Sequence, residues 1–310
     1  MYMRTMSDRA GIMCERRGFG PIRKRVLRSV GGRAATAFTL IELLVVIAVV
    51  VLLMAILVPA LQRVRRQAGA VVCQSNLRQW ALIYSAYTND YDGKFWRTYE
   101  PVTNRPNWWV GMFRPYCEDS NDLLICPLAA TADVATPQSA WNADDFGDTG
   151  GVFSAWRLYY YRALGEGPLF TGSYGHNHFV MDNSPDPRCL SYANPASYYW
   201  QARPATKGQA AIPLLTDAPW AEIVEADPNC PPPSSESICE PGSNVFDVCI
   251  NRHDGYVNGL FMDSSVRKIG LKELWTLKWH RQFNTAGPWT TAGGVRPDNW
   301  PEWIRGFKDY

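Results

Sequence analysis

Residues 36–42 read TAFTLIE, and they lead into sixteen uninterrupted apolar residues, Leu43 to Val58. In the whole segment 38–61 only Thr39, Glu42 and Pro59 interrupt the apolar character. At ~1.5 Å rise per residue, a helix of this length extends about 36 Å, enough to cross a hydrocarbon core about 30 Å thick with some tilt. Residues 38–61 are therefore predicted to form a transmembrane helix.

The 37 residues before this helix form a basic leader. They contain nine Arg or Lys residues and two acids, a net charge of +7. The positive-inside rule predicts that the leader stays in the cytoplasm and that the rest of the chain is exported. Arg63, Arg65 and Arg66 oppose this orientation but are outnumbered.

Two simpler interpretations of the apolar segment stay open. A secretory signal peptide could be cut near Val58-Pro59-Ala60, although its apolar region is usually about 7–15 residues long and carries no acid. A plain signal anchor is the second. Glu42 weighs against both, because a carboxylate in an apolar helix costs up to about 2.5–3.5 kcal/mol at the bilayer centre and usually marks a function or a partner. Alternatively, Glu42 reaches toward cytoplasmic water.

The order of basic leader, Phe-Thr-Leu-Ile-Glu and apolar helix resembles the type IV prepilin family, which includes the pseudopilins of type II secretion. The resemblance implies that a prepilin peptidase cuts between Ala37 and Phe38 and methylates the new amine. The family usually has Gly where this chain has Ala37. Glu42 would be the fifth mature residue and would pair with the N-terminal amine of a neighbouring subunit. The implied partners are the peptidase, other pilin-like subunits and the inner membrane, with the C-terminal domain periplasmic or extracellular.

Later segments are similar to a large-ectodomain group of this family that has a C-terminal H-x9-D-G motif. The matching pieces are residues 72–79, 87–93, 124–127, 173–177 and 214–217, and the stretch from His253 to Asp263-Ser264. Here Ser264 replaces the usual Gly. The resemblance also suggests that Cys73 and Cys126 form a disulfide.

Charge and cysteine content characterise the exported part. Without the leader, the chain has 22 basic and 27 acidic residues, a net charge of −5, which argues against a nucleic-acid partner. Seven of the eight cysteines follow the leader, and in an oxidising compartment they would tend to form disulfides. Because seven is odd, at least one stays free or pairs between chains. The chain has no C-x-x-C, which disfavours a zinc ribbon or a thioredoxin-type site.

Apolar spacings of three and four residues continue beyond Pro59 and predict an amphipathic continuation over 62–92, so that one helix covers about 39–90. Its predicted apolar stripe contains Val64, Ala68, Val71, Val72, Leu77, Ala81, Tyr84 and Tyr87. Asn89 and Gly93 indicate its end.

Residues 93–310 are predicted to form a loop-rich exported domain. Antiparallel strands are expected at 245–250, 256–262 and 265–269, with turns at 254–255 and 263–265, followed by a short helix at 271–279. The proline-rich stretch 227–233 is expected to be an exposed loop. The predicted fold class is α+β, with the long helix packed on an antiparallel sheet.

No constellation in the sequence predicts catalysis or a firm cofactor site. His253 and Asp263 would mark opposite ends of a strand about 23 Å long, which favours structural hairpin residues. His176 and His178 would share a strand face and, with Asp217, are weak metal candidates. Residues 142–148 partly imitate a calcium loop but lack oxygen donors at Phe146 and Phe153.

These observations predict a non-enzymatic, pseudopilin-like structural subunit without a cofactor, calcium being the one open possibility. The alternative is a membrane-tethered surface-binding or hydrolytic ectodomain that uses a prepilin-like anchor. Clustered aromatics on an exposed face, or a pocket that gathered His176, His178 and Asp217, would favour this alternative.

Overall fold

The computed structural model describes residues 39–96, 99–100, 105–106, 109–117, 121–129, 147–148, 150–158, 170–182, 195–200, 206–224, 226–236 and 248–310. The chain divides into two compact units, residues 1–55 and residues 56–310. The α-helices are α1 (Leu40–Asp90), α2 (Trp109–Cys117) and α3 (Glu302–Arg305). The strands are β1 (Tyr99–Glu100), β2 (Arg105–Pro106), β3 (Gly147–Asp148), β4 (Trp156–Leu158), β5 (Phe170–Gly172), β6 (Tyr174–Asn177), β7 (Pro213–Asp217), β8 (Glu222–Ile223), β9 (Tyr256–Phe261) and β10 (Val266–Gly270). Short 3-10 helices cover Asn121–Leu124, His178–Val180, Ala196–Tyr198, Gln209–Ala211, Leu271–Thr276 and Pro297–Asn299.

Helix α1 confirms the long helix predicted over about 39–90. A capping box closes its first turn: Glu42 Oε2 accepts hydrogen bonds from Thr39 N at 2.9 Å and from Thr39 Oγ1 at 2.8 Å, and Thr39 Oγ1 accepts one from Glu42 N at 3.2 Å. The helix continues through Pro59. It ends where predicted, since Asp92 and Gly93 adopt left-handed conformations with φ of 54° and 77°.

The first part of α1 is apolar on all sides. Among the described residues, α1 is the helix that is long and apolar enough to cross a membrane, and none of its most apolar window is buried. Every side chain from Leu40 to Leu61 is exposed. So many exposed Leu, Ile and Val side chains require an apolar environment, and a membrane anchor supplies one.

The domain within residues 56–310 is built on a five-stranded sheet with the order β10-β9-β7-β6-β8. All neighbours pair antiparallel except β6 and β8, which are parallel, so the sheet is mixed. Strands β9 and β10 confirm the pair predicted at 256–262 and 265–269. The turn before β9 has left-handed Asp254 and Gly255, and the turn after it has left-handed Ser264, with φ of 58°, 96° and 70°.

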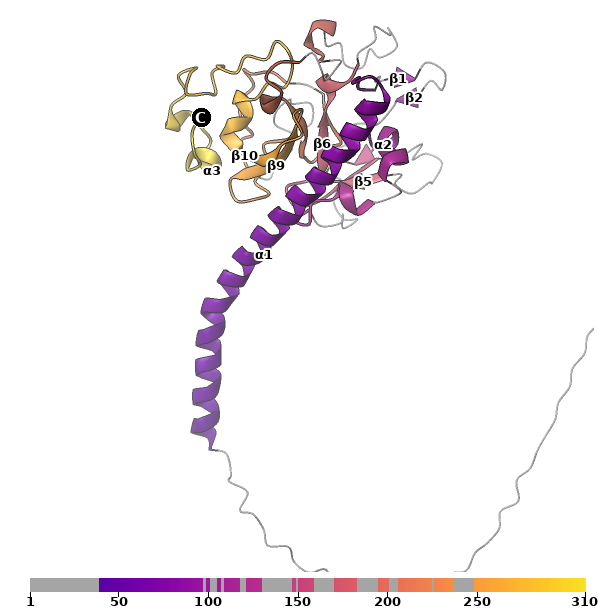
Figure 1. Ribbon diagram of the computed structural model, residues 1–310. Coiled ribbons are helices and arrows are strands. Elements are labelled where there is room, and N and C mark those ends of the chain that lie inside the picture. Colours follow the sequence, from indigo (N-terminus) through magenta and orange to yellow (C-terminus); the bar gives the residue numbers. More distant parts are fainter. Residues whose placement is uncertain are drawn as a thin grey trace, which may run out of the picture. The chain divides into compact units, whose positions relative to one another are not determined.

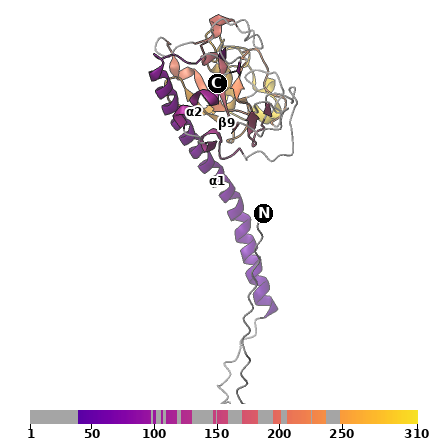
Figure 2. The ribbon, with the colours of Figure 1, turned by 90° about the vertical axis from the view of Figure 1, so that its right-hand side faces the viewer.

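Two apolar cores lie on opposite faces of this sheet within residues 56–310. Leu260 and Phe261 are neighbours on β9 but belong to different cores, as the alternation of side chains along a strand requires. The core with Leu260 is covered by the second half of α1 and by α2, and the core with Phe261 by the C-terminal segment 271–310. In both ribbon views the second half of α1 lies along one side of this domain (Figure 1, Figure 2).

The buried face of α1 differs from the predicted stripe. Leu77, Ala81, Tyr84 and Tyr87 are buried as predicted, but Val64, Ala68, Val71 and Val72 are exposed. The buried residues are Gly69, Ala70, Cys73, Asn76, Leu77, Trp80, Ala81, Ile83, Tyr84, Tyr87 and Thr88. The prediction was wrong for the first turns because this stretch has apolar side chains on two faces, and periodicity cannot tell which face meets the sheet.

Glycine at position 69 allows α1 to approach the rest of the domain closely. A Cβ atom built on Gly69 would lie 2.7 Å from Leu128 Cδ2, a separation that would force one of the two to move. One turn earlier, Arg66 Nη1 forms an exposed ion pair with Asp254 Oδ1 at 2.8 Å. One turn later, Gln74 Nε2 donates to Asn258 Oδ1 at 2.9 Å. The first contacts of α1 with the domain are therefore concentrated between residues 66 and 74.

Tryptophan side chains stabilise the loop-rich parts of the domain. The proline-rich stretch 227–233 was predicted to be exposed, but Pro232 and Pro233 are buried. Trp275 Nε1 donates to Cys230 O at 2.9 Å, and Trp303 Nε1 donates to Pro233 O at 2.8 Å. An indole that buries its ring while donating one hydrogen bond suits this role, because irregular backbone leaves carbonyls unpaired.

Two further predictions about the C-terminal region need correction. The helix expected at 271–279 is a 3-10 helix that ends at Thr276. Of the strand expected at 245–250, residues 245–247 lie outside the described residues, and residues 248–250 are not a strand. Ile250 N donates to Val248 O at 2.8 Å and Arg252 N donates to Ile250 O at 2.9 Å. These local backbone hydrogen bonds take the place of the hydrogen bonds to a neighbouring strand that were expected here.

Candidate metal centre

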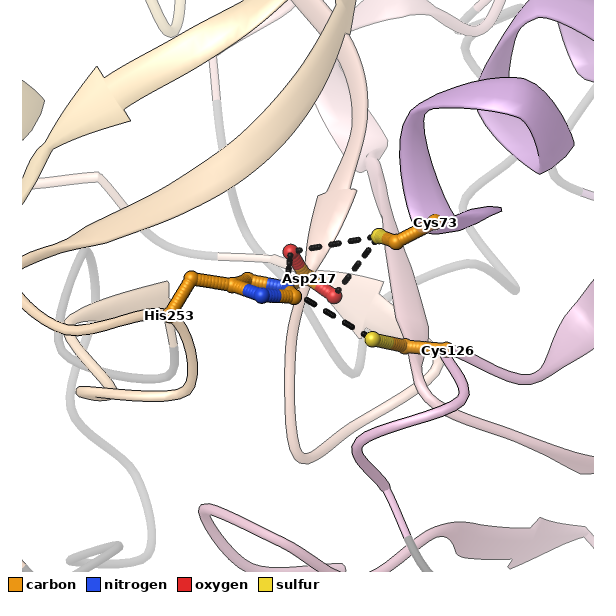
Figure 3. A group of neighbouring side chains, drawn as sticks. All are labelled: Cys73, Cys126, Asp217 and His253. Atoms are coloured by element: carbon orange, nitrogen blue, oxygen red, sulfur yellow. Dashed lines mark hydrogen bonds and ion pairs between the residues drawn. The ribbon is translucent and has the colours of Figure 1, made fainter. Parts of the chain in front are cut away.

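Four buried side chains with metal-binding atoms meet in the core between α1 and the sheet. Cys73, Cys126, Asp217 and His253 each offer one ligand atom, and these atoms all lie within 4.8 Å of one another. Cys73 comes from α1, Asp217 is the last residue of β7, and the other two lie in irregular segments (Figure 3). The four side chains point toward a common centre (Figure 3).

Local structure explains how each of these side chains reaches the centre. Cys73 lies on the buried face of α1, and Cys126 is fixed by a hydrogen bond from its amide to Ser173 Oγ at 2.7 Å. Ser173 also accepts a backbone hydrogen bond from Ala218 N at 2.9 Å, next to Asp217. His253 directly precedes the left-handed turn that begins β9, and this turn directs its ring inward.

Asp217 is the hub of the cluster. Its Oδ1 accepts from Arg252 Nη1 at 3.2 Å, and its Oδ2 lies 3.0 Å from His253 Nε2 and accepts from Asn258 N at 2.8 Å. Cys73 Sγ lies 3.5 Å and 3.7 Å from the two oxygens. Burial alone would raise the pKa of this carboxyl, but His253 and Arg252 outweigh it and lower the pKa to about 2.

The two thiols and the imidazole differ in protonation. Burial raises the pKa of Cys73 well above its usual range, whereas the hydrogen bond with Cys73 lowers the pKa of Cys126 to about 6. Burial would lower the pKa of His253, but the charge and the hydrogen bond of Asp217 raise it to about 9. Together with Arg252, the cluster therefore places acidic and basic side chains in direct contact away from solvent.

The arrangement does not have the geometry of a cysteine-type catalytic triad. His253 Nε2 lies 3.5 Å from Cys126 Sγ and 3.0 Å from Asp217 Oδ2, so one ring nitrogen faces both groups. In a triad, the carboxylate binds the nitrogen that the nucleophile does not use. The other nitrogen, His253 Nδ1, is buried and has no hydrogen-bond partner. Disulfide formation and metal binding are the chemistries that the group supports.

The structure brings together only some of the predicted site residues. Cys73 and Cys126, the predicted disulfide partners, are neighbours here, and both are thiols. Asp217, a predicted metal candidate, lies with them. His253 is in the predicted turn, but its side chain is buried in the cluster, whereas Asp263 stays in its own turn and accepts from Ser265 N at 3.0 Å.

The two remaining histidine candidates do not join this group. His176 packs against the rings of Trp96 and Tyr84, and both of its ring nitrogens are buried without a hydrogen-bond partner. Burial lowers its pKa well below the usual value. His178 begins a 3-10 helix rather than continuing β6, and its Nδ1 lies 3.5 Å from Glu222 Oε2. The predicted shared strand face is therefore not formed.

Several other predictions fall outside the described residues. Ala37 and Phe38, the predicted processing site, lie there, as do residues 142–146 of the calcium-like loop and Cys189 and Cys239. Glu42 is described and lies in the first turn of α1. The predicted cut and the calcium site therefore stay predictions.

Sequence reasoning noted all four cluster residues but did not assemble them. Cys73 and Asp217 are 144 positions apart, and Cys126 and His253 are 127 apart, so no spacing motif connects them. The usable signal was that all four residues fell in the short pieces singled out in the sequence, residues 72–79, 124–127 and 214–217 and the stretch that begins at His253. No protein-family model matches the chain, and no curated protein or solved structure is significantly similar to it.

Proposed function

We propose that the chain is a pseudopilin-like structural subunit that is anchored in the inner membrane and assembles through α1. The observation that carries the proposal is α1 itself. One helix combines an apolar part that is exposed on all sides with a part that packs on the exported domain. The same helix therefore supplies both an apolar surface for a membrane and a surface that packs on the domain, and the pilin-like subunits that the N-terminal segment resembles have such a helix.

The outer face of α1 supports assembly with further copies or related subunits. Val64, Val71 and Leu82 are 58%, 63% and 72% exposed, beyond the membrane-spanning part. Val71 follows Val64 by about two helical turns and Leu82 follows Val71 by about three, so the three lie on one line. Cys73 and Tyr84, in the buried face, point away from that line. Exposed Ser75 and Arg78 lie on the same side between Val71 and Leu82, so the line is a mixed face whose apolar members are these three side chains. We propose that a helix of a neighbouring subunit packs on it.

The first turn of α1 supports the predicted role of Glu42. In the single chain the carboxylate is satisfied by Thr39. The free amine of a processed neighbour would be a stronger partner, because each charge relieves the cost of burying the other in an apolar environment. We propose that assembly exchanges the first interaction for the second.

The alternative function receives less support. A surface-binding ectodomain was expected to cluster aromatics on an exposed face, and a hydrolytic one to gather His176, His178 and Asp217 in a pocket. In the described part of the domain these residues do not form one group of ligand atoms, and the cluster that contains Asp217 is buried. The structural subunit is therefore the better-supported proposal.

The N-terminus of the mature protein tests the processing step. Protein from the native host is expected to begin at Phe38 with an N-methyl group, because residues 36–42 combine the basic leader with the Phe-Thr-Leu-Ile-Glu entry. Intact-mass and N-terminal peptide mass spectrometry measure it. An intact leader, or a start near Leu61, would contradict processing by a prepilin peptidase.

The outer face of α1 gives a second test. We expect Val71→Arg to leave the stability of the exported domain within about 0.5 kcal/mol, because position 71 is exposed. The same change is expected to reduce cross-linking between subunits several-fold, because it places a charge in an apolar helix contact. Gln79→Arg, on an exposed polar position of the same helix, is the matched control. Equal cross-linking in the two variants would remove the outer face from the interface.

A further inference from the structure

We propose that Cys73, Cys126, Asp217 and His253 bind one Zn²⁺ ion in a closed, four-coordinate site that joins α1 to the sheet of the exported domain. This inference is independent of filament assembly. It concerns how the domain is held together, and it would apply equally to a tethered domain that does not polymerise.

The spacing of the ligand atoms fits a tetrahedral ion. Zinc–sulfur bonds of about 2.3 Å and zinc–nitrogen or zinc–oxygen bonds of about 2.0–2.2 Å place neighbouring ligand atoms about 3.3–3.8 Å apart in a tetrahedron. Cys126 Sγ lies 3.5 Å from His253 Nε2, and Cys73 Sγ lies 3.7 Å from Asp217 Oδ2. The pair His253 Nε2 and Asp217 Oδ2 is slightly closer, at 3.0 Å. The remaining ligand atoms all lie within 4.8 Å of one another, so shifts of at most about 1 Å would complete the tetrahedron.

The donor set selects the metal and the kind of site. Two sulfurs and an imidazole suit zinc and are poor ligands for calcium or magnesium, which prefer oxygen. All four residues are buried, with side chains of His253 and Asp217 fully shielded from solvent. Four protein ligands and no access for water or substrate are typical of structural zinc sites rather than catalytic ones.

The charges around the cluster also fit a divalent ion. Two thiolates, one carboxylate, a neutral imidazole and Zn²⁺ leave one negative charge, and every proton that the two sulfurs and His253 Nε2 carry beforehand passes to solvent when the metal binds. Arg252 supplies the balancing positive charge: its guanidinium is fully buried and donates to Asp217 Oδ1 at 3.2 Å. The same guanidinium also donates to Ser173 O at 2.8 Å and to Val152 O at 2.6 Å, so its position does not depend on Asp217 alone.

Hydrogen bonds from outside the cluster already orient Cys73 and Asp217, whereas His253 Nδ1, which would face away from the ion, has no such partner. Tyr174 Oη donates to Cys73 Sγ at 3.3 Å, and Asn258 N donates to Asp217 Oδ2 at 2.8 Å. Such outer contacts hold metal ligands in position, and their loss typically weakens metal binding ~10–100-fold. A disulfide between Cys73 and Cys126 would use the same sulfurs and exclude the metal, but it would leave the presence of His253 and Asp217 beside both sulfurs unexplained.

The test uses the full chain, purified in detergent under reducing conditions and without added metal. Elemental analysis is expected to find one zinc per chain. Exchange with Co²⁺ is expected to give the visible bands of a tetrahedral ion and a thiolate-to-cobalt band in the ultraviolet. Cys73→Ser is expected to lose zinc affinity by more than the ~10–100-fold typical of an outer-layer change, and Tyr174→Phe to lose affinity within that range.

Cys249→Ser provides the matched control, because Cys249 is also a buried thiol but lies outside the cluster. It is expected to retain one zinc. If Cys73→Ser does not fold, alkylation of the unaltered chain still tests the proposal. Bound zinc is expected to protect Cys73 and Cys126 from alkylation, and a chelator is expected to make both react. Absence of zinc even after incubation with Zn²⁺, equal zinc in the Cys73 and Cys249 variants, or a disulfide-linked peptide containing Cys73 and Cys126 would overturn the proposal.

Discussion

Asp217→Ala is expected to destabilise the exported domain by about 3–5 kcal/mol. The substitution leaves the buried guanidinium of Arg252 without its counter-charge, and removing one partner of a buried ion pair has a cost of about this size. It also leaves the amide of Asn258 without its acceptor. Urea unfolding of the full chain in detergent, followed by tryptophan fluorescence, measures the difference.

The unfolding experiment should be done in the presence of a chelator, so that loss of a metal does not add to the loss of the ion pair. Asp263→Ala is the matched control, because Asp263 is an exposed acid whose bonds are confined to its own turn. Asp263→Ala is expected to lower the free energy of unfolding by at most about 1 kcal/mol. A loss in Asp217→Ala no larger than in the control would mean that Arg252 finds another partner or reaches water.

Glu42→Ala is expected to abolish or strongly reduce assembly while leaving membrane insertion intact. Removing a carboxylate from an apolar helix makes insertion slightly more favourable. It also removes the proposed partner of the neighbouring amine. Site-specific cross-linking between subunits in membranes of the native host, together with membrane fractionation, separates the two effects.

Glu42→Gln distinguishes charge pairing from helix capping. Gln keeps an oxygen that can accept from Thr39 N, as the capping box requires, but it has no charge. If the charge matters, Glu42→Gln fails to assemble just as Glu42→Ala does. Wild-type cross-linking in Glu42→Ala would argue against a pilin-like role, and rescue by Gln alone would assign the residue to the cap.

The long helix and the β9–β10 hairpin could be predicted because their signals are local. An apolar run followed by spacings of three and four residues determines α1, and alternation around left-handed turn residues determines the hairpin. The face that α1 buries could not be predicted in its first turns. Val71, Val72 and Cys73 are consecutive, yet only Cys73 is buried, and the position of the sheet decides which of them is covered.

The cluster was not predictable for a different reason. His253 was placed in a turn correctly, but the residue it meets is at the end of β7, which reaches β9 through tertiary pairing of strands far apart in the chain. The direction of the His253 side chain depends on the left-handed turn at Asp254 and Gly255. Neither the pairing of distant strands nor the direction of a side chain beside a left-handed turn produces a periodic pattern in the sequence. The four ligands could therefore be noted one by one but not predicted to lie together.

The continuity of α1 has a mechanical consequence. Within residues 56–310, a tension along the helix backbone meets the rest of the domain first through Arg66, Gly69, Cys73 and Gln74. These contacts lie one after another along the helix, so a pull along its axis loads them together in shear instead of peeling them one at a time. The helix should therefore detach only when all of these contacts break together, so the domain should keep its contacts with the helix under a sustained load.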